Sequence, residues 1–358
     1  MRGQLLKTLV SLLITLLCLG SLLSTLIWFM IDSNNEDLRR PVPQKKRPPK
    51  NFDLCKGCKE VIEKVLQEYS QTWKKQEDNY LKFRSKLNSN CHGPEKAFIT
   101  QGNTPVGTKI VYDGEKKRSL EVTSEIFSTF VKVRPFLNKT WDTCAVVGNG
   151  GILTDSGCGA AIDSAQFVIR CNLPPLKDGF EKHVGVKTSL VTANPSILRD
   201  KYGNLMGRRR AFVEDLKTYS DSLLLLPAFS YGINTPVSLR ASYTIEDFGS
   251  PIQPVFFNPE YLRNLANFWR SQGLRAGRPS TGLLMASLAL ELCNNVDLYG
   301  FWPFDSHPYG LYALTNHYYD DRQAGRVHAM PAEFQLLMRL HNDGVLKLHI
   351  GDCRPGKK

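Results

Sequence analysis

Two histidines in the C-terminal part of the sequence are suited to acid–base chemistry. They lie in the stretches HYYD (317–320) and HAMPAE (328–333). An imidazole exchanges protons near neutral pH, although a lone histidine is more often structural. Pro331 favours the first turn of a helix, which places His328 just before a helix N-terminus. The helix dipole there favours the neutral imidazole, which can accept a proton.

A second candidate site is the segment RPSTG (278–282), which leads into the apolar helical stretch Leu283 to Cys293. Ser280 or Thr281 can cap that helix through its hydroxyl oxygen. The first-turn amides and the positive end of the dipole can also bind an anion. A cap and an anion site share the same geometry, so both interpretations stay open.

Glycines follow the apolar strand Cys144 to Val147, in the order Gly148-Asn149-Gly150-Gly151. Without β-carbons, the backbone amides of such a turn can approach a phosphate or nucleotide, although a tight strand-to-helix turn explains the glycines equally well. The third glycine of the dinucleotide fingerprint would fall at Leu153, which argues against a nicotinamide- or flavin-dependent oxidoreductase.

Asparagines and aromatic residues follow three further apolar runs. Asn172 and Asn194 each come at the end of a run with proline close behind, where an amide can accept from and donate to a sugar or base. The run ending at Tyr299 continues as GFWP (300–303), and Trp302 could stack on a base. An aromatic cluster is more often part of the core.

From residue 143 onward, short apolar runs alternate with helical patterns. This alternation predicts a Rossmann-like α/β domain, with a largely parallel sheet flanked by helices. Ligands of this architecture bind at the carboxyl ends of the strands. The expected strands are Cys144 to Val147, Phe167 to Arg170, Ser189 to Thr192, Leu223 to Leu226, Val255 to Phe257, Val296 to Tyr299 and Leu346 to Ile350.

Residues 51–90 show apolar side chains at spacings of three and four from Val61 to Trp73, which predicts an amphipathic helix. The same region holds Cys55, Cys58 and Cys91. A zinc site would require a second pair of cysteines at a suitable interval, so we expect structural disulfides here.

The run from Thr8 to Ile31 contains no charged residue and is long enough to cross a hydrocarbon core of roughly 30 Å. It continues into Trp28-Phe29-Met30 where a cleavable signal would show small residues, so we expect an uncleaved anchor. Only a short tail with Arg2 and Lys7 precedes it, which predicts a lumenal C-terminal part.

Composition agrees with this topology. The chain has 358 residues, a formal net charge of +12 and nine cysteines, which suit an oxidising compartment. Residues 39–50 carry six basic residues between prolines and form a linker. The sequon at Asn138 can accept a glycan if it is lumenal. The sequence has no Asp-x-Asp triplet that could hold a divalent ion, so we expect metal-independent chemistry.

Taken together and in order, these segments resemble the four sialylmotifs of the animal sialyltransferases. The similarity covers nearly all of residues 91–353, with the motifs at 144–198, 278–302, 317–320 and 328–333. Six segments resemble the α2,8 branch in sequence: CAVVGNGGIL, RCNLPP, VTANPSI, STGL, LYGFWPF and HAMPAEF. The segments NTPVGT and KYGNL are most similar to the member that acts on sialylated O-glycans.

The resemblance implies roles for individual residues. His328 would be the general base and His317 would stabilise the departing phosphate. The residues implied to bind the donor CMP-sialic acid are Asn149, Asn172, Ser280, Thr281, Gly282 and Trp302. It also implies disulfides between Cys144 and Cys293 and between Cys158 and Cys353, which leaves Cys171 as a buried thiol.

A type II Golgi membrane enzyme is implied as well. Its parts would be a cytoplasmic tail (1–7), a transmembrane anchor (8–31), a stem with the leading helix (32–90) and a lumenal catalytic domain (91–358). Its acceptor would be a sialylated glycoprotein or glycolipid, with no cofactor and no nucleic-acid partner, and a homodimer stays open. Because CMP is a good leaving group, positioning and proton transfer suffice, and direct displacement would invert the anomeric centre.

Two positions depart from the α2,8 pattern. Asn316 stands where the branch has a second histidine, and Pro279 follows Arg278 where leucine is common. The acceptor's carboxylate would need a basic site, for which Arg208 to Arg210 is a candidate, with a solvated loop as the alternative. The alternative function is a catalytically inactive lumenal glycan-binding protein of the same fold.

Overall fold

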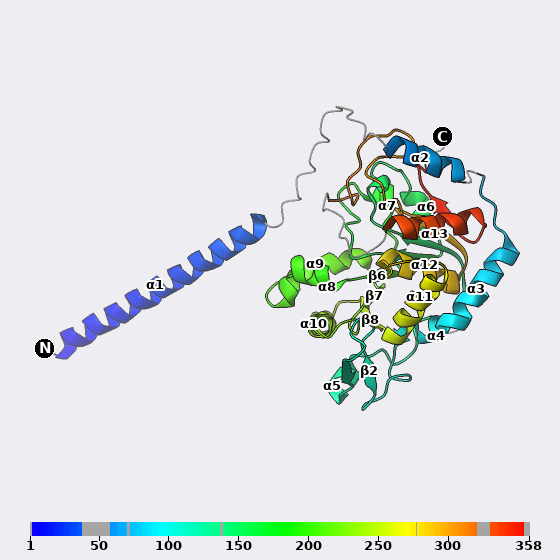
Figure 1. Cartoon of the computed structure of the whole chain (residues 1–358). Coiled ribbons are helices and arrows are strands. Elements are labelled where there is room, and N and C mark those ends of the chain that lie inside the picture. The colour runs from blue at the N-terminus through cyan, green and yellow to red at the C-terminus, as the bar shows by residue number, and fades with distance from the viewer. Residues whose placement is uncertain are drawn as a thin grey trace. The chain divides into compact units, whose positions relative to one another are not determined.

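The computed structural model describes residues 2–37, 58–69, 72–136, 139–276, 278–320 and 330–353, which divide into two units, Met1–Asp53 and Leu54–Lys358 (Figure 1). The first unit is the helix α1 (Arg2–Asp37). Its segment Val10–Ile27 has a mean hydropathy of 2.3 and is long enough to cross a membrane. The apolar run expected to form an anchor is therefore helical throughout. Two expected functional residues, Asn138 and His328, lie outside the described residues.

The second unit begins with two helices rather than one. α2 (Cys58–Glu68) and α3 (Glu77–Cys91) are separate, so the prediction of one helix continuing to Trp73 is wrong in extent. The side chain of Tyr69, the residue after α2, explains where the helix ends. Its hydroxyl donates to the Leu348 carbonyl at 2.6 Å, and its ring stacks on His341 with centroids 4.5 Å apart. These contacts come from the far end of the chain and are invisible in the local pattern.

An eight-stranded sheet forms the centre of this unit, in the order β1-β8-β7-β6-β5-β4-β9-β10. All pairs are parallel except β1 with β8, so the prediction of a largely parallel sheet is confirmed. Each of the seven expected strands is present. The strands are β1 (Phe98–Ile99), β4 (Trp141–Val147), β5 (Phe167–Arg170), β6 (Leu190–Thr192), β7 (Leu223–Leu226), β8 (Gln253–Phe257), β9 (Cys293–Tyr299) and β10 (Lys347–His349), and a separate hairpin pairs β2 (Lys109–Val111) with β3 (Ser119–Glu121).

Helices cover both faces of the sheet (Figure 1). Along β4, Cys144 and Val146 pack on one face, while Ala145 and Val147 pack on the other, as the alternation of a strand requires. The first face contacts α3, α11 (Pro259–Ser271), α12 (Thr281–Leu292) and α13 (Met330–Asn342). The second contacts α6 (Gly159–Ser164), α8 (Pro195–Asp200), α9 (Arg209–Leu216) and α10 (Asn234–Asp247). The remaining short helices are α4 (Gly93–Ala97), α5 (Ser124–Ser128) and α7 (Glu181–Val184).

The strand order reverses between β4 and β9. From β4 the chain builds outward through β5, β6, β7 and β8, and then returns to place β9 and β10 on the other side. In an open α/β sheet, ligands bind in the crevice at the carboxyl ends of the strands at such a switch point. The fold therefore predicts a ligand site at the segments that follow Val147 and Tyr299.

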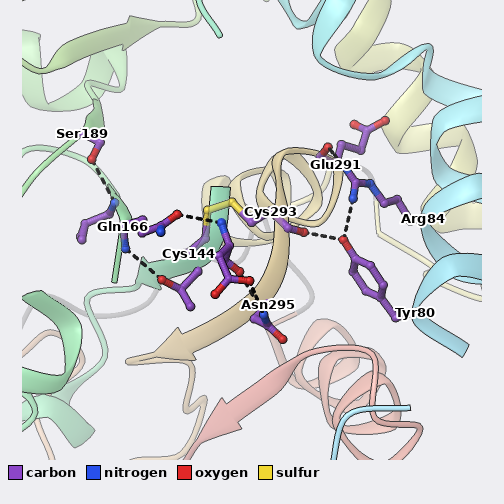
Figure 2. Close-up of a disulfide and its surroundings, with 11 residues drawn as sticks. Tyr80, Arg84, Cys144, Gln166, Ser189, Glu291, Cys293 and Asn295 are labelled. Atoms are coloured by element: carbon purple, nitrogen blue, oxygen red, sulfur yellow. Dashed lines mark hydrogen bonds between the residues drawn. A yellow bond between two sulfur atoms is a disulfide. The ribbon is translucent and has the colours of Figure 1, made fainter. Parts of the chain in front are cut away.

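A disulfide between Cys144 and Cys293 joins β4 to β9 directly across the switch point, with Cα atoms 5.9 Å apart (Figure 2). The Tyr80 hydroxyl from α3 donates to the Cys293 carbonyl at 2.5 Å beside it. A second disulfide joins Cys158 to Cys353. These are the two pairs that the resemblance implied. Together they tie the last described residues and the two strands that flank the switch point into one framework.

Two further cysteines of this unit, Cys91 and Cys171, are free. Cys91 and Cys171 are buried thiols, and burial raises the pKa of each to about 12. The expectation of a disulfide at Cys91 is therefore wrong. Its position at the buried end of α3, within the core and beside Glu291, keeps the thiol protonated.

Candidate functional site

The glycine loop after β4 packs against the loop after β9, backbone to backbone. Gly148 donates to the Tyr299 carbonyl at 2.7 Å, and Gly150 donates to the Gly300 carbonyl at 3.1 Å. A β-carbon on Gly150 would lie 2.6 Å from that Gly300 oxygen, and one on Gly151 would collide with the Thr315 carbonyl. The tight-turn interpretation of these glycines thus holds, because their missing side chains let two loops of the protein meet.

Asn149 lies at the centre of this loop. Its Nδ2 donates to the Cys171 carbonyl at 2.8 Å, and its backbone carbonyl accepts from Tyr318 at 2.9 Å. Its Oδ1 is buried and has no hydrogen-bond partner among the described residues. A buried acceptor left unpaired costs free energy that a donor group on a ligand can offset. Asn149 is therefore both fixed in place and incompletely satisfied at the switch point.

Asn172 and Asn194 continue the site along the ends of β5 and β6. Asn172 has φ of 66°, a left-handed conformation that asparagine tolerates better than most residues. Its backbone N–H donates to Thr192 Oγ1 at 2.9 Å, and its Oδ1 accepts from the Asn194 backbone at 3.0 Å. Asn194 Nδ2 in turn donates to Thr281 Oγ1 at 3.2 Å. Side chains from two motifs, 144–198 and 278–302, are thereby linked at one edge of the sheet.

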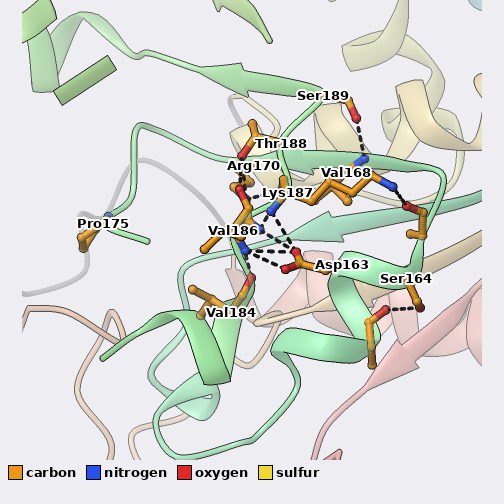
Figure 3. A network of polar contacts seen from close by, with 12 residues as sticks. Asp163, Ser164, Val168, Arg170, Pro175, Val184, Val186, Lys187, Thr188 and Ser189 are labelled. Carbon is orange, nitrogen blue, oxygen red and sulfur yellow. Dashed lines mark hydrogen bonds and ion pairs between the residues drawn. The ribbon is translucent and has the colours of Figure 1, made fainter. Parts of the chain in front are cut away.

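A buried cation holds the end of β5 in place (Figure 3). Arg170 is fully buried and donates to the carbonyls of Val184 and Lys187, each at 2.8 Å. Asp163 lies 3.7 Å from its guanidinium and also accepts from the backbone of residues 186 and 187. Burial lowers the pKa of Arg170, and Tyr318 and Asp163 oppose that shift. The sequence indicates Arg170 only as a member of a motif. Its charge at the end of an apolar strand is the one sequence feature that points to its role in fixing the end of β5.

Ser280 caps α12, as one of the two sequence interpretations predicted. Its Oγ accepts from the Leu283 N–H at 3.1 Å, and it also contacts Glu333 of α13. The Ser280 backbone N–H donates to Glu333 Oε1 at 2.8 Å. This buried carboxylate joins the first turn of α13 to the first turn of α12. The sequence indicates Glu333 only as part of a motif, because nothing local in the sequence identifies its partner.

Trp302 lies in the core beneath the site. Its side chain is 7% exposed, its Nε1 donates to the Ser306 carbonyl at 2.8 Å, and its ring packs edge-on against Phe334 of α13. The core interpretation of this aromatic segment is the one that the structure supports. Gly282 has a similar supporting place, since a β-carbon there would lie 2.8 Å from the ring of Phe301.

His317 reaches the same edge of the sheet from the segment that follows β9. It forms a β-bridge with Gly150, and its Nδ1 lies 2.7 Å from Asp320 Oδ1. Its ring stacks on Tyr319 and is partly exposed, with 31% of the side chain accessible. Asn316 Nδ2 lies 3.4 Å from His317 Nε2, so the residue that departs from the α2,8 pattern sits beside the imidazole. Asp320 orients the ring for proton transfer or anion binding at the remaining nitrogen.

In the basic run at 208–210, two of the three arginines contact the protein, and Arg210 is exposed. Arg209 forms an ion pair with Asp247 and donates to Thr244 Oγ1 at 3.0 Å, while Arg208 donates to the Lys201 carbonyl. An exposed cation therefore remains in this run, and its role toward an acceptor carboxylate stays a prediction. Across the described ranges, no group of three or more His, Cys, Asp and Glu side chains could hold a metal ion.

Comparisons with known proteins agree with this arrangement. Residues 98–345 match the sequence model of glycosyltransferase family 29 (sialyltransferase). Human alpha-2,8-sialyltransferase 8F is 46% identical over 282 residues, which is 78% of this chain and 71% of the relative. The alpha-N-acetylneuraminide alpha-2,8-sialyltransferase of Xenopus tropicalis is 44% identical over 299 residues, 83% of this chain and 86% of the relative.

A crystal structure of a mammalian sialyltransferase has the same fold. It superposes with a TM-score of 0.52 at 23% identity, covering 75% of this chain and 95% of the other. Residues 98–345, which the family model matches, include every strand from β1 to β9 and the described segments that meet at the switch point. The chain therefore belongs to glycosyltransferase family 29, the sialyltransferases.

Proposed function

We propose that this chain transfers sialic acid from CMP-sialic acid to O8 of a sialic acid at the end of a glycan, forming an α2,8 linkage. The observation that carries the proposal is the meeting of the Asn149 loop, Asn172, His317 and the start of α12 at one switch point. The linkage follows the printed names of relatives at 44% and 46% identity, which are alpha-2,8-sialyltransferases.

The donor would lie along the loops that follow β4, β5 and β9. Asn149 Oδ1, which has no hydrogen-bond partner among the described residues, can accept from an amino or hydroxyl group of the nucleotide. The Ser280 and Leu283 amides are already bonded within the protein, so the Thr281 and Gly282 amides are left for the phosphate at the positive end of α12. Trp302 would act as a support beneath the donor, since its ring packs in the core.

Catalysis requires a base for the acceptor hydroxyl and a group that stabilises the leaving phosphate. We assign the first role to His328 and the second to His317. His328 precedes α13, and the bond between Glu333 and Ser280 fixes the first turn of that helix beside α12. A single displacement with no covalent enzyme intermediate would invert the anomeric centre, and no metal ion is needed for either role.

His317→Ala is expected to lower kcat about 100-fold, the usual cost of losing one donor that stabilises developing negative charge. Asp320→Asn should lower kcat about tenfold, because the imidazole keeps its place but loses the carboxylate that orients it. Initial rates at saturating donor and acceptor measure both. If Asp320→Asn is as active as the wild type, Asp320 has no positioning role. If His317→Ala is as active, the phosphate role of His317 is wrong.

We further propose that α1 is a type II anchor in the Golgi membrane, with residues 91–358 as the lumenal catalytic domain and Asn138 as a glycosylated site. The support is one apolar helix near the N-terminus and a disulfide framework that requires an oxidising compartment. The acceptor would be a sialylated O-glycan or a glycolipid.

A transfer assay tests the function and its metal independence. The full-length protein in detergent is incubated with CMP-sialic acid and with sialylated O-glycans, sialylated N-glycans and gangliosides, with and without EDTA. We expect a disialyl product, measured by mass, from at least one acceptor class, with a rate unchanged by EDTA. Transfer that stops with EDTA and returns with a divalent ion would contradict the proposed chemistry. Binding of CMP without turnover on any acceptor would favour the inactive binding protein.

A further inference from the structure

A cavity of about 370 Å³ lies outside the donor loops, between α11, the segment after β2 and the segment after β7. This volume falls in the range of small-ligand sites. Its wall from α11 includes Arg263, Ala266, Asn267 and Arg270, whose spacing of three and four places them on one face of the helix.

Cations dominate the polar lining of this cavity. Four basic side chains line it, Lys116, Arg263, Arg270 and Arg278, against the single carboxylate of Asp113. Arg278 pairs with Asp113 at 3.5 Å and lies over the ring of Tyr231. The other three form no ion pair with any carboxylate among the described residues. The cavity thus keeps an excess of positive charge that an anionic ligand can neutralise.

One acceptor in the cavity is also unsatisfied. Asp113 Oδ1 is buried and has no hydrogen-bond partner in the described part of the chain, while its carboxylate contacts Arg278 and Ser230. An unpaired buried acceptor favours a ligand that carries O–H or N–H donors besides its negative charge. A phosphate dianion offers no such donor, so the lining fits a carboxylated sugar better than the phosphate of the donor.

The cavity adjoins the place proposed for the donor phosphate. Arg278 and Pro279 line it, and the next two residues, Ser280 and Thr281, begin α12. Two residues of chain span at most about 7 Å. A sugar held in the cavity would therefore lie next to the reacting end of the donor.

We infer that this cavity binds the terminal sialic acid of the acceptor. Its carboxylate would bind the guanidinium groups of Arg263 and Arg270, and a hydroxyl or acetamide N–H would donate to Asp113 Oδ1. Guanidinium groups match a carboxylate in both charge and planar geometry. This inference rests on the proposed α2,8 function and names the residues that distinguish a sialylated acceptor from a neutral one.

The test uses the full-length enzyme and two acceptors, a sialylated glycan and the same glycan with the terminal carboxylate converted to an amide. For the wild type, we expect KM to be about tenfold higher for the amide, as for the loss of one partly exposed charge-assisted bond. Arg270→Gln should raise KM for the carboxylate acceptor by a similar factor and should no longer distinguish the two acceptors. Arg263→Gln should also raise KM for the carboxylate acceptor and should not distinguish the two acceptors.

Arg275→Gln is the matched control, because Arg275 is exposed on the neighbouring segment and does not line the cavity. It should leave both KM values unchanged. Donor hydrolysis without acceptor and KM for CMP-sialic acid should stay at the wild-type level in all three variants, which also shows that they are folded.

Three outcomes overturn the inference. These are equal KM values of the wild type for both acceptors, KM values of Arg270→Gln and Arg263→Gln that match those of Arg275→Gln, and a change in the variants of KM for CMP-sialic acid only. In each case the wild type still forms a disialyl product and the proposed function stands. Absence of transfer by the wild type to every sialylated acceptor instead contradicts the proposed function itself.

Discussion

His328→Ala is expected to lower kcat about 10²- to 10⁴-fold, the range usual for loss of a general base. The acceptor hydroxyl is a very weak acid, so its attack on the donor depends on a group that takes up the proton in the transition state. Affinity for CMP-sialic acid should change little, because the base contacts the acceptor hydroxyl. Initial rates at saturating substrates and donor binding by titration measure the two effects separately.

A matched control for His328→Ala is His92→Asn. His92 is exposed and has φ of 61°, a conformation that asparagine also adopts, and it lies between α3 and α4, outside the motifs. This variant should keep the wild-type kcat. Near wild-type turnover by His328→Ala at saturating acceptor would show that another group removes the proton.

Loss of the disulfide across the switch point is the second large effect. In the chain-entropy model, closing a loop of 149 residues stabilises the fold by about 5 kcal/mol. Domains are commonly stable by only about 5–15 kcal/mol in total. We therefore expect the double variant Cys144→Ala/Cys293→Ala to be produced in low yield and to unfold at a much lower denaturant concentration than the wild type, as measured by tryptophan fluorescence.

Cys91→Ala separates the cross-link from the burial of sulfur. Cys91 is a buried thiol outside any disulfide, so its replacement removes a similar side chain and leaves the cross-link intact. It should cost about 1–2 kcal/mol. If the double variant loses no more than about twice that amount, the disulfide does not stabilise this fold through loop closure.

Several of the strands that the sequence predicted correctly share one physical property. Runs such as Phe167 to Arg170 and Leu223 to Leu226 are buried on both faces, so they appear as uninterrupted apolar segments. The three strands that were not expected, β1, β2 and β3, have only two or three residues. Such short segments carry no period that distinguishes them from a loop. β6 and β10 are as short, but their place in the alternation of strands and helices indicated them.

The local apolar pattern did not predict where the first helix of the second unit ends. The apolar spacing from Val61 to Tyr69 continues to Trp73, and nothing in it marks the end of α2 at Glu68. That end coincides with the contact of Tyr69 with His341 and Leu348, more than 270 residues away. A contact between distant residues overrides local propensity here.

The site shows the same division. Residue types and order indicated Asn149, Asn172, Ser280 and His317, and the structure brings all four to the switch point. The packing of α13 determines the bond between Ser280 and Glu333 and the burial of Trp302. No local sequence pattern indicates this packing. The basic cavity likewise joins residues from three distant segments.

Determination of the linkage in the product tests the central claim most directly. The full-length protein is given CMP-sialic acid labelled with ¹³C at C2 and a glycan ending in unlabelled sialic acid, and the product is examined by two-dimensional NMR. We expect the labelled C2 to be in the α configuration and to correlate with H8 of the unlabelled residue. A correlation to a galactose proton, a β-configured product, or free labelled sialic acid alone would contradict the account.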